Sequence, residues 1–421
     1  MMLLYSLVVR LYGLLIRCSV PFSEKARKWV NGRKNIWQEL ELKFTNNTQK
    51  VAWFHCASLG EFEQGRPVIE KFKTLYPDYF ILLSFFSPSG FEIRKNYPGA
   101  DCIVYLPLDT PYNASRFINI TKPKVVFFIK YEFWLHYLNI LTKNSIPHFL
   151  FSAVFRNNQI FFKPWGKIFR NALKGYNHIF TQDENSALLL KSIEISQCSK
   201  AGDTRHDRVS SIAANASEIN AAKIFSEGFQ ILVAGSTWPE DEQKLVPSIV
   251  RLLRSGIKLI IAPHEISESK ISSLISLCKE NGIDENRIVR FSYAENADLK
   301  HADVLIVDNI GMLSSLYRYG GVAYIGGGFG KSIHNTLEAA VYGIPVVFGP
   351  AYKKFIEAHE LLKNQAAFTV NNQEELEKIL TRLFSDQQFR NTSGKKAGEY
   401  VSSGKGATEQ ILATADEVIS R

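Results

Sequence analysis

The stretch "VAWFHCASLGEFEQGRP", residues 51–67, contains a strand, a loop and the start of a helix. Residues 51–56 form an almost continuous apolar run, as expected of a strand in a parallel sheet that is covered on both faces. Small residues follow, and Ser58 to Glu61 have the S-x-x-E spacing of a helix capping box. We therefore interpret the stretch as a strand–loop–helix unit of an α/β fold.

Glu61 has two interpretations at this level. As a cap, its carboxylate reaches back to the backbone N–H of Ser58. As a functional group, it lies after the carboxyl end of a strand, where open α/β sheets bind ligands. Spacing alone leaves the two nearly even. A first-turn position also predicts that the helix dipole lowers the pKa of Glu61 and keeps it ionised.

The same alternation of apolar runs and helical patterns continues along the chain. In the first half, further strands are predicted at 80–85, 102–107, 125–129, 148–154 and 178–182, with helices at 64–76 and 184–192. In the second half, strands are predicted at 230–236, 258–263, 287–291, 303–308, 322–327 and 344–350, with helices at 240–254 and 266–281. Residues 201–228 are small and polar and are interpreted as a linker with an entry helix, and 406–421 as a final helix. Two doubly wound domains facing each other across a cleft fit this order.

Composition excludes several classes of protein. A chain of 421 residues with 46% apolar and 22% charged residues is neither disordered nor a polytopic membrane protein, and it is long enough for two or three domains. The five cysteines are scattered, which argues against a disulfide framework. Neither a zinc-type Cys/His cluster nor a D-x-D motif occurs in the sequence, so we expect no metal.

Residues 1–35 carry most of the net charge of +9, with seven basic residues against Glu24. They include the apolar stretch "MMLLYSLVVRLYGLLIRCSV", and an apolar segment with basic flanks indicates a membrane with anionic lipids rather than nucleic acid. Arg10 and Arg17 interrupt the stretch, and no signal-peptide cleavage site follows it. We expect this stretch to form a helix that lies in the membrane interface. A short transmembrane span is the second interpretation, and a helix packed on its own protein is the least expected.

The strongest glycine motif is "GGGFGKSIHNTLEAA", residues 326–340, between a predicted strand and a predicted helix. Such a loop lets a phosphate approach the backbone and the helix N-terminus. The motif is not Walker A and matches a dinucleotide fingerprint only loosely. Asn335 and Glu338 have a cap-like N-x-x-E spacing, so Glu338 either caps the helix or binds a ribose diol.

Other predicted strands also end in candidate binding residues. Ser236 and Thr237 could bind an anion or cap the next helix, and His264 could contact a ligand or simply be exposed. Gly311 permits close approach to a ligand, and Glu132 is a second strand-end carboxylate.

In this order, the motifs resemble the Kdo transferases, GT-B glycosyltransferases that move 3-deoxy-D-manno-octulosonic acid (Kdo) from CMP-Kdo to a lipid A precursor. The resemblance covers nearly the whole chain and rests on "RKWVNGRK", "CASLGE", "SPSGFE", "YLPLDTP", "YEFW", "AGDTRHDR", "GSTWPEDE", "DNIGML" and "GGGFGKSIHNTLEAAVYGIPVVFGP".

The resemblance implies site residues. Glu61 matches the catalytic base, and the acceptor side comprises Glu132, Ser58, Gly60, Ser87 and Ser89. The donor side comprises Ser236, Thr237, Pro263, His264, Gly311, Met312, Gly327, Gly328, Lys331, Asn335 and Glu338. The family's P-R-H-P-E-R loop reads "PHEISES" here, so His264 or Lys331 would replace an arginine at the donor phosphate, and Met312 replaces an acid. With this match we favour catalysis for Glu61 and leave capping mainly to Ser58.

The resemblance also implies the organisation of the protein. The expected parts are a membrane anchor (1–35), an acceptor-binding Rossmann-like domain (36–205), a CMP-sugar-binding Rossmann-like domain (206–405) and a helix (406–421) packed back on the N-terminal domain. We expect inverting, metal-independent transfer at the cytoplasmic side of the inner membrane, without nucleic acid. Alternatives are another GT-B enzyme, a nicotinamide-dependent oxidoreductase, for which "CASLGE" is the wrong loop, and a non-catalytic membrane-associated protein.

Overall fold

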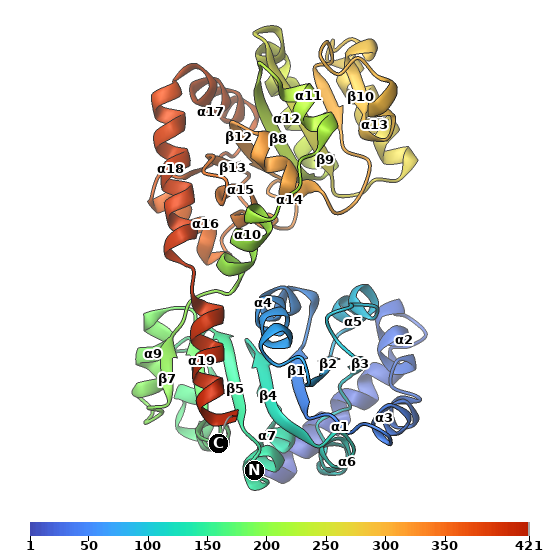
Figure 1. The fold of residues 1–421 in the computed structure, drawn as a ribbon, viewed down its shortest axis with the longest axis vertical. Helices are drawn as coiled ribbons and strands as arrows, with labels where there is room; N and C mark the ends of the chain where they lie inside the picture. Colours follow the sequence, from blue (N-terminus) through green and yellow to red (C-terminus); the bar gives the residue numbers. More distant parts are fainter. Residues whose placement is uncertain (420–421) are drawn as a thin grey trace. The chain divides into compact units, whose positions relative to one another are not determined.

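Two parallel sheets of seven strands each organise residues 1–419, the part of the chain that the computed structural model describes (Figure 1). The N-terminal unit comprises residues 1–208 and the C-terminal segment from Lys405. The C-terminal unit comprises residues 209–404. Both sheets carry helices on their two faces, as continuous apolar strands require.

The sheet of the N-terminal unit has the order β3-β2-β1-β4-β5-β6-β7. Its strands are β1 (Val51–Cys56), β2 (Phe80–Phe85), β3 (Cys102–Tyr105), β4 (Pro123–Ile129), β5 (His148–Ala153), β6 (His178–Thr181) and β7 (Cys198–Lys200). All six residues of β1 are buried. The strand order reverses between β1 and β4, so the ligand-binding crevice of such a sheet is expected at their carboxyl ends.

Three helices precede β1, and the later helices of this unit alternate with the strands in a doubly wound pattern (Figure 1). They are α1 (Met2–Cys18), α2 (Glu24–Asn31), α3 (Ile36–Phe44), α4 (Leu59–Leu75), α5 (Pro88–Arg94), α6 (Pro111–Thr121), α7 (Leu135–Lys143), the short helices η1 (Ile160–Phe162) and η2 (Pro164–Gly166), α8 (Lys167–Lys174) and α9 (Glu184–Lys191). Helix α10 (Arg205–Ala214) begins in this unit and continues into the next.

The C-terminal unit repeats this architecture, with the strand order β10-β11-β9-β8-β12-β13-β14. Its strands are β8 (Gln230–Thr237), β9 (Ile257–Pro263), β10 (Ile288–Arg290), β11 (Val304–Ile306), β12 (Val322–Ile325), β13 (Val346–Phe348) and β14 (Ala367–Thr369). Here the order reverses between β8 and β12, which pair directly.

The helices of the C-terminal unit include four of twelve or more residues. They are α11 (Asn220–Ser226), α12 (Pro239–Arg254), α13 (Glu268–Glu280), η3 (Glu285–Arg287), η4 (Phe291–Asn296), α14 (Leu313–Leu316), η5 (Tyr317–Tyr319), α15 (Leu337–Ala340), α16 (Ile356–Lys363), α17 (Gln373–Ser385) and α18 (Gln387–Ser403).

The last helix, α19 (Ala407–Ile419), belongs to the N-terminal unit and packs on α4. Its buried residues Ile411, Leu412 and Ala415 join the apolar core that covers one face of the sheet. Asp207 accepts the backbone N–H groups of Gly406 (2.7 Å) and Thr408 (2.8 Å), and so it caps the helix. Residues 420–421 of the predicted helix lie outside the described residues.

The strand predictions are confirmed at all twelve positions, with shifted ends. The strands β7 and β14 were not predicted, because each has a single buried residue and its sequence, CSK or AFT, carries too little apolar pattern. The expected linker with one entry helix is wrong in detail, since residues 201–228 contain both α10 and α11.

Helix α1 packs one face on the N-terminal unit. Tyr5 Oη donates to Asp109 Oδ2 (2.5 Å), Ser6 Oγ lies 2.8 Å from His136 Nε2, and Val9 is buried. The low rank given to a helix packed on its own protein is therefore wrong for this face, because two polar side chains supply specific contacts.

The other face of α1 is exposed and apolar. It carries Leu3, Leu4, Leu7, Val8, Leu11, Leu14 and Leu15. Among the described residues, no helix combines the length and the apolar character that crossing a bilayer would need. An interfacial position of α1 stays a prediction.

Arg33 is one of the seven basic residues in the segment 1–35, but its guanidinium is directed into the protein. Its Nε donates to the carbonyl of Leu106 (2.8 Å) and its Nη2 to that of Phe86 (2.8 Å), and the guanidinium lies 3.8 Å from the ring centroid of Trp29. Burial lowers the pKa of Arg33 to about 9. Its role is to tie the N-terminal helices to the sheet.

Candidate active site

Two carboxylates lie at the reversal point of the N-terminal sheet. Glu61 stands in the first turn of α4, directly after β1, and Glu132 follows the neighbouring strand β4. Glu61 Oε2 accepts the backbone N–H of Ser58 at 2.9 Å. Glu61 therefore takes part in the cap itself, and the prediction that left capping mainly to Ser58 is corrected.

The pKa of Glu61 is raised to about 7, first by burial and then by the nearby charge of Glu132. Lys130 and the backbone N–H groups of Ser58 and Ala57 lower it, but they do not compensate. The expected lowering by the helix dipole is therefore wrong. Desolvation and a like charge outweigh the dipole at this position.

Glu132 is only 2% exposed and is held by a buried polar chain. His55 Nε2 lies 2.8 Å from Glu132 Oε2, and the indole Nε1–H of Trp134 donates to the same oxygen. On the other side of the ring, His55 Nδ1 lies 2.8 Å from Ser84 Oγ. Ser84 Oγ also accepts from the indole of Trp53 at 2.7 Å. The site carboxylate thus has one fixed orientation.

His55 was not predicted from the sequence. It is a polar residue in an otherwise apolar strand and has no exposed surface. That interruption, one strand away from a strand-end acid, was the only available signal.

The predicted acceptor-side hydroxyls lie on the neighbouring loops. Ser87 caps α5, and its Oγ lies 3.1 Å from Ser89 Oγ. A Cβ at Gly90 would collide with the Phe85 ring and approach the backbone of Ser58, so α5 begins close to the loop that carries Glu61. Gly60 is exposed with open space around it.

Asp241 organises the reversal point of the C-terminal sheet. Its fully buried carboxylate accepts the backbone N–H groups of Trp238 (2.9 Å), Gly327 (2.7 Å) and Phe329 (3.3 Å) and the hydroxyl of Tyr324 (2.9 Å). It therefore ties the loop after β8 to the glycine loop after β12. Asp241 was not predicted from the sequence as a site residue.

Packing inside the unit accounts for two of the predicted glycines. A Cβ at Gly327 would collide with the carbonyl of Ser332, and one at Gly328 with the backbone of Gly349. Both are buried, whereas Gly330 and Lys331 beyond them are exposed. Phosphate contacts at Gly327 and Gly328 stay predictions.

Three aromatic rings lie on the loops after β8, β9 and β12. His264 stacks on Trp238 with ring centroids 4.5 Å apart and lies 4.7 Å from His334. Trp238 Nε1 donates to His334 Nε2 at 3.1 Å. Burial and the neighbouring His264 hold the pKa of His334 below its usual range. These rings give a flat surface suited to a nucleobase or sugar.

The remaining donor-side residues have separate environments. Asn335 Nδ2 donates to Glu338 Oε1 at 3.0 Å, while Asn335 Oδ1 accepts the backbone N–H of Leu337 at 3.1 Å. Thr237 Oγ1 donates to Glu242 at 2.9 Å, Pro263 ends β9, and Met312 packs on the unit's core. Gly311 is exposed with φ 97°, a conformation that favours glycine.

Ser236 and Lys130 have left-handed backbones, with φ of 53° and 74°. Each lies at the carboxyl end of a strand at a reversal point. Non-glycine residues in this conformation are strained and concentrate at functional sites.

Two exposed lysines near the glycine loop were not identified from the sequence. Lys353 and Lys354 lie in the loop after β13. That loop is held against the glycine loop, since the N–H of Ala351 donates to the carbonyl of Gly328 (3.0 Å). They join Lys331 as candidate cations for a phosphate.

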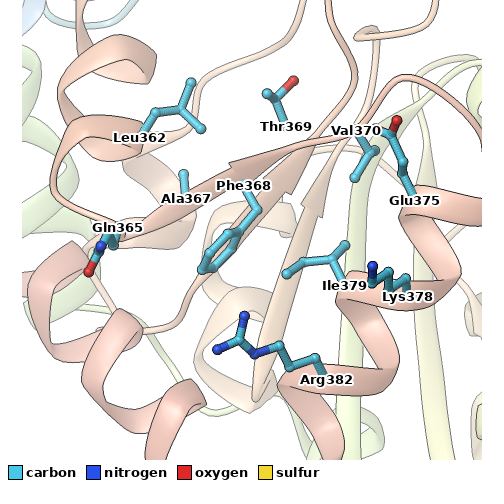
Figure 2. Close-up of a pocket in the computed structure, with 10 residues that line it drawn as sticks. All are labelled: Leu362, Gln365, Ala367, Phe368, Thr369, Val370, Glu375, Lys378, Ile379 and Arg382. Carbon is cyan, nitrogen blue, oxygen red and sulfur yellow. The ribbon is translucent and has the colours of Figure 1, made fainter.

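A cavity of about 440 Å³ lies elsewhere in the C-terminal unit, at the free edge of β14 (Figure 2). Its lining includes Leu362, Gln365, Phe368, Thr369, Ile379 and Arg382. None of the predicted donor residues lines it. Among the described residues, no group of three or more His, Cys, Asp or Glu side chains is arranged to hold a metal ion.

Two doubly wound sheets with polar loops at both reversal points define the fold class of GT-B enzymes and their neighbours. The fold of this chain resembles that of UDP-GlcNAc 2-epimerase from Neisseria meningitidis (TM-score 0.60, 14% identity, covering 88% of this chain and 100% of that one). It also resembles that of MurG from Acinetobacter baumannii (TM-score 0.53, 13% identity, covering 87% and 98%). At these identities the likeness shows the fold.

The sequence comparisons define the family. Residues 34–208 match the family model described as 3-deoxy-D-manno-octulosonic-acid transferase. The chain is 30% identical over 344 residues to the 3-deoxy-D-manno-octulosonic acid transferase of Aquifex aeolicus, covering 80% of this chain and 87% of that protein. It is 26% identical to the enzyme of the same name from Rickettsia felis, covering 80% and 72%. The chain belongs to the family of Kdo transferases, and it is therefore a glycosyltransferase.

Proposed function

We propose that this protein transfers Kdo from CMP-Kdo to a lipid A precursor with inversion at the anomeric carbon, and that Glu61 is the general base. The observation that carries this assignment is the position of Glu61 at the reversal point of the sheet, beside Glu132 and with a pKa raised to about 7. A base with a pKa near the working pH combines an adequate ionised fraction with a strong tendency to take a proton.

The proposed step needs few groups. A hydroxyl of the acceptor sugar attacks the anomeric carbon of Kdo, the bond to the CMP phosphate breaks, and Glu61 takes the hydroxyl proton as the new bond forms. Such base catalysis contributes about 10²–10⁴-fold. Glu132, fixed by His55 and Trp134, raises the basicity of Glu61.

The donor is assigned to the C-terminal unit. The stacked rings of Trp238 and His264 are suited to the cytosine or the sugar, and the Asn335–Glu338 pair to a ribose diol. Lys331, Lys353 and Lys354 are the cations proposed for the phosphate in place of the missing arginine. CMP is a phosphate monoester, which carries less charge than a nucleoside diphosphate, so we propose transfer without a metal.

CMP should raise the melting temperature of the full chain, whereas UDP and GDP should not. Ligand at 100 times its Kd stabilises by about 2.7 kcal/mol, which shifts Tm by roughly 5–10 °C in a unit of this size. Thermal-shift measurements with the three nucleotides test this. Stabilisation by UDP or GDP alone would instead support another GT-B enzyme with a different nucleotide sugar.

The acceptor and the membrane are assigned to the N-terminal unit. The exposed apolar face of α1 and the exposed Arg10, Arg17, Lys25 and Arg27 suit an interface with anionic lipids. We place the enzyme at the cytoplasmic side of the inner membrane, where the acyl chains of the acceptor can stay in the bilayer while its sugar reaches Glu61.

Glu132→Gln should move the acid limb of the pH profile of kcat/KM to lower pH. The charge of Glu132 disfavours ionisation of Glu61, so its removal lowers the pKa of Glu61. Glu63→Gln is the matched control. Glu63 lies in α4 like Glu61, but its carboxylate pairs with Arg94 at 2.9 Å. An unchanged acid limb in Glu132→Gln would contradict the role of Glu132.

A further inference from the structure

Helix α1 contacts the start of α7, which follows Glu132 by three residues. Tyr5 of α1 donates its hydroxyl to Asp109 Oδ2 at 2.5 Å. Asp109, which is fully buried, accepts the backbone N–H groups of His136 (3.1 Å) and Tyr137 (3.0 Å) in the first turn of α7. Tyr5 Oη also accepts the N–H of Leu135 at 3.4 Å. Together, Tyr5 and Asp109 cap α7.

A second contact connects α1 with the carboxylate site through aromatic rings. Tyr12 stacks on Phe86 at 6.2 Å between centroids, and Phe86 packs on Trp134 at 4.6 Å. Trp134 donates to Glu132 and lies 3.1 Å from His55 Nε2. Helix α1 therefore holds the segment that carries Glu132 at two points. Tyr5 holds the start of α7, and Tyr12 supports the indole of Trp134 through Phe86.

We propose that α1 is a positioning element of the carboxylate site, in which Tyr5 fixes the Glu132–Trp134 segment through Asp109. The proposal rests on the catalytic role assigned to the two carboxylates and deepens it. If α1 served only as a membrane anchor, it would need no more than its exposed apolar face. The contacts of Tyr5 lie on the opposite, packed face and are directed at the segment that bears a site residue.

The energetics favour a specific role for the hydroxyl. Burial raises the pKa of Asp109 to about 6, while the donors from Tyr5 and α7 lower it. Loss of one of these donors leaves a buried carboxylate less well satisfied, at a cost of about 1–3 kcal/mol. The cap of α7 then loosens where the chain leaves Glu132.

The pH profile reports on this arrangement. The groups that face Glu61 are Glu132, Lys130 and Tyr131 after β4, and Cys56 in β1. A shift of the Glu132 segment away from Glu61 removes the largest charge effect that raises its pKa. The acid limb of kcat/KM then moves to lower pH.

Tyr5→Phe tests the proposal in the full-length, detergent-solubilised enzyme. We expect kcat to fall about tenfold or more, with an unchanged KM for CMP-Kdo, a lower-pH acid limb and unchanged binding to vesicles that contain anionic lipids. The matched control is Tyr112→Phe, since Tyr112 is an exposed tyrosine of the same unit whose hydroxyl accepts from Arg116 at 3.3 Å. This control should retain wild-type kcat and pH profile.

Wild-type kcat and pH profile in Tyr5→Phe would overturn the proposal, as would a loss of activity that appears only together with loss of vesicle binding. If Tyr5→Phe fails to fold, judged by its Tm, Tyr12→Ala tests the positioning role of α1 through its second contact, because Tyr12 is 47% exposed and stacks on Phe86, which packs on Trp134. Wild-type kcat and pH profile in a folded Tyr12→Ala would then overturn the role of α1. Activity in Glu61→Gln would refute the proposed base instead, so the two failures are distinguishable.

Discussion

Replacing Glu61 with glutamine should reduce transfer by about 10²–10⁴-fold and, at pH 8, make the protein more stable than the wild type. Glutamine keeps the size of the side chain, and its carbonyl can still accept the N–H of Ser58. It cannot take a proton from the attacking hydroxyl. Activity is therefore lost while the first turn of α4 stays capped.

The stability gain follows from the sign of the pKa shift. The pKa of Glu61 is about 7 in the folded protein, above its ordinary value of 4.5, so the folded state binds more protons between these values. The free energy of unfolding of the wild type therefore falls as pH rises through this window, by about 1–3 kcal/mol. Glu61→Gln carries no carboxyl group here and does not lose stability in this way. The difference in free energy of unfolding between the variant and the wild type should therefore be largest above pH 7 and vanish near pH 4.

Urea unfolding at several pH values, together with transfer assays, measures both effects. Glu63→Gln serves again as the control, because it removes an acid from the same helix without touching the site. Near-normal transfer in Glu61→Gln would refute the base assignment. A stability difference that does not change with pH would contradict the raised pKa.

Asp241→Asn should weaken donor binding and destabilise the C-terminal unit. The amide presents an NH₂ group where one carboxylate oxygen now accepts the hydroxyl of Tyr324 and the N–H of Phe329. The hydroxyl can turn and accept from the amide, but the N–H of Phe329 is left without an acceptor. Such a buried unpaired donor costs about 1–3 kcal/mol.

The glycine loop should therefore move away from the loop after β8. We expect the KM for CMP-Kdo to rise about tenfold or more, with a smaller change for the acceptor. Steady-state kinetics and calorimetric titration with CMP measure this. Glu240→Gln, an exposed acid in the same first turn, should leave both quantities unchanged. Wild-type CMP affinity in Asp241→Asn would show that the loop connection does not shape the donor site.

The two parallel sheets could be predicted because buried parallel strands are apolar along their whole length. The position of Glu61 and Glu132 at strand ends could be predicted for the same reason. The burial and the hydrogen-bond partners of these two carboxylates could not be predicted. The contact of Glu132 with His55 joins a residue after β4 to one in β1, and no local pattern predicts it. Burial of Glu61, together with the charge of Glu132, raises the pKa of Glu61, whereas the helix dipole alone predicted a lower value.

The glycine loop gives a similar lesson. Its composition indicated phosphate binding, but Gly327 and Gly328 lack side chains because other backbone segments pack against them. Asp241 is separated from this loop by 86 residues, and no local pattern connects the two. Local spacing identifies which loops matter, whereas the contacts that fix their shape arise only when the sheet is assembled.

The return of α19 to the N-terminal unit has a consequence for biosynthesis. The core that Ile411, Leu412 and Ala415 complete stays open until the last helix leaves the ribosome. The C-terminal unit, residues 209–404, is topologically an insertion and has its full set of strands earlier. The domain that starts first along the chain is thus finished last.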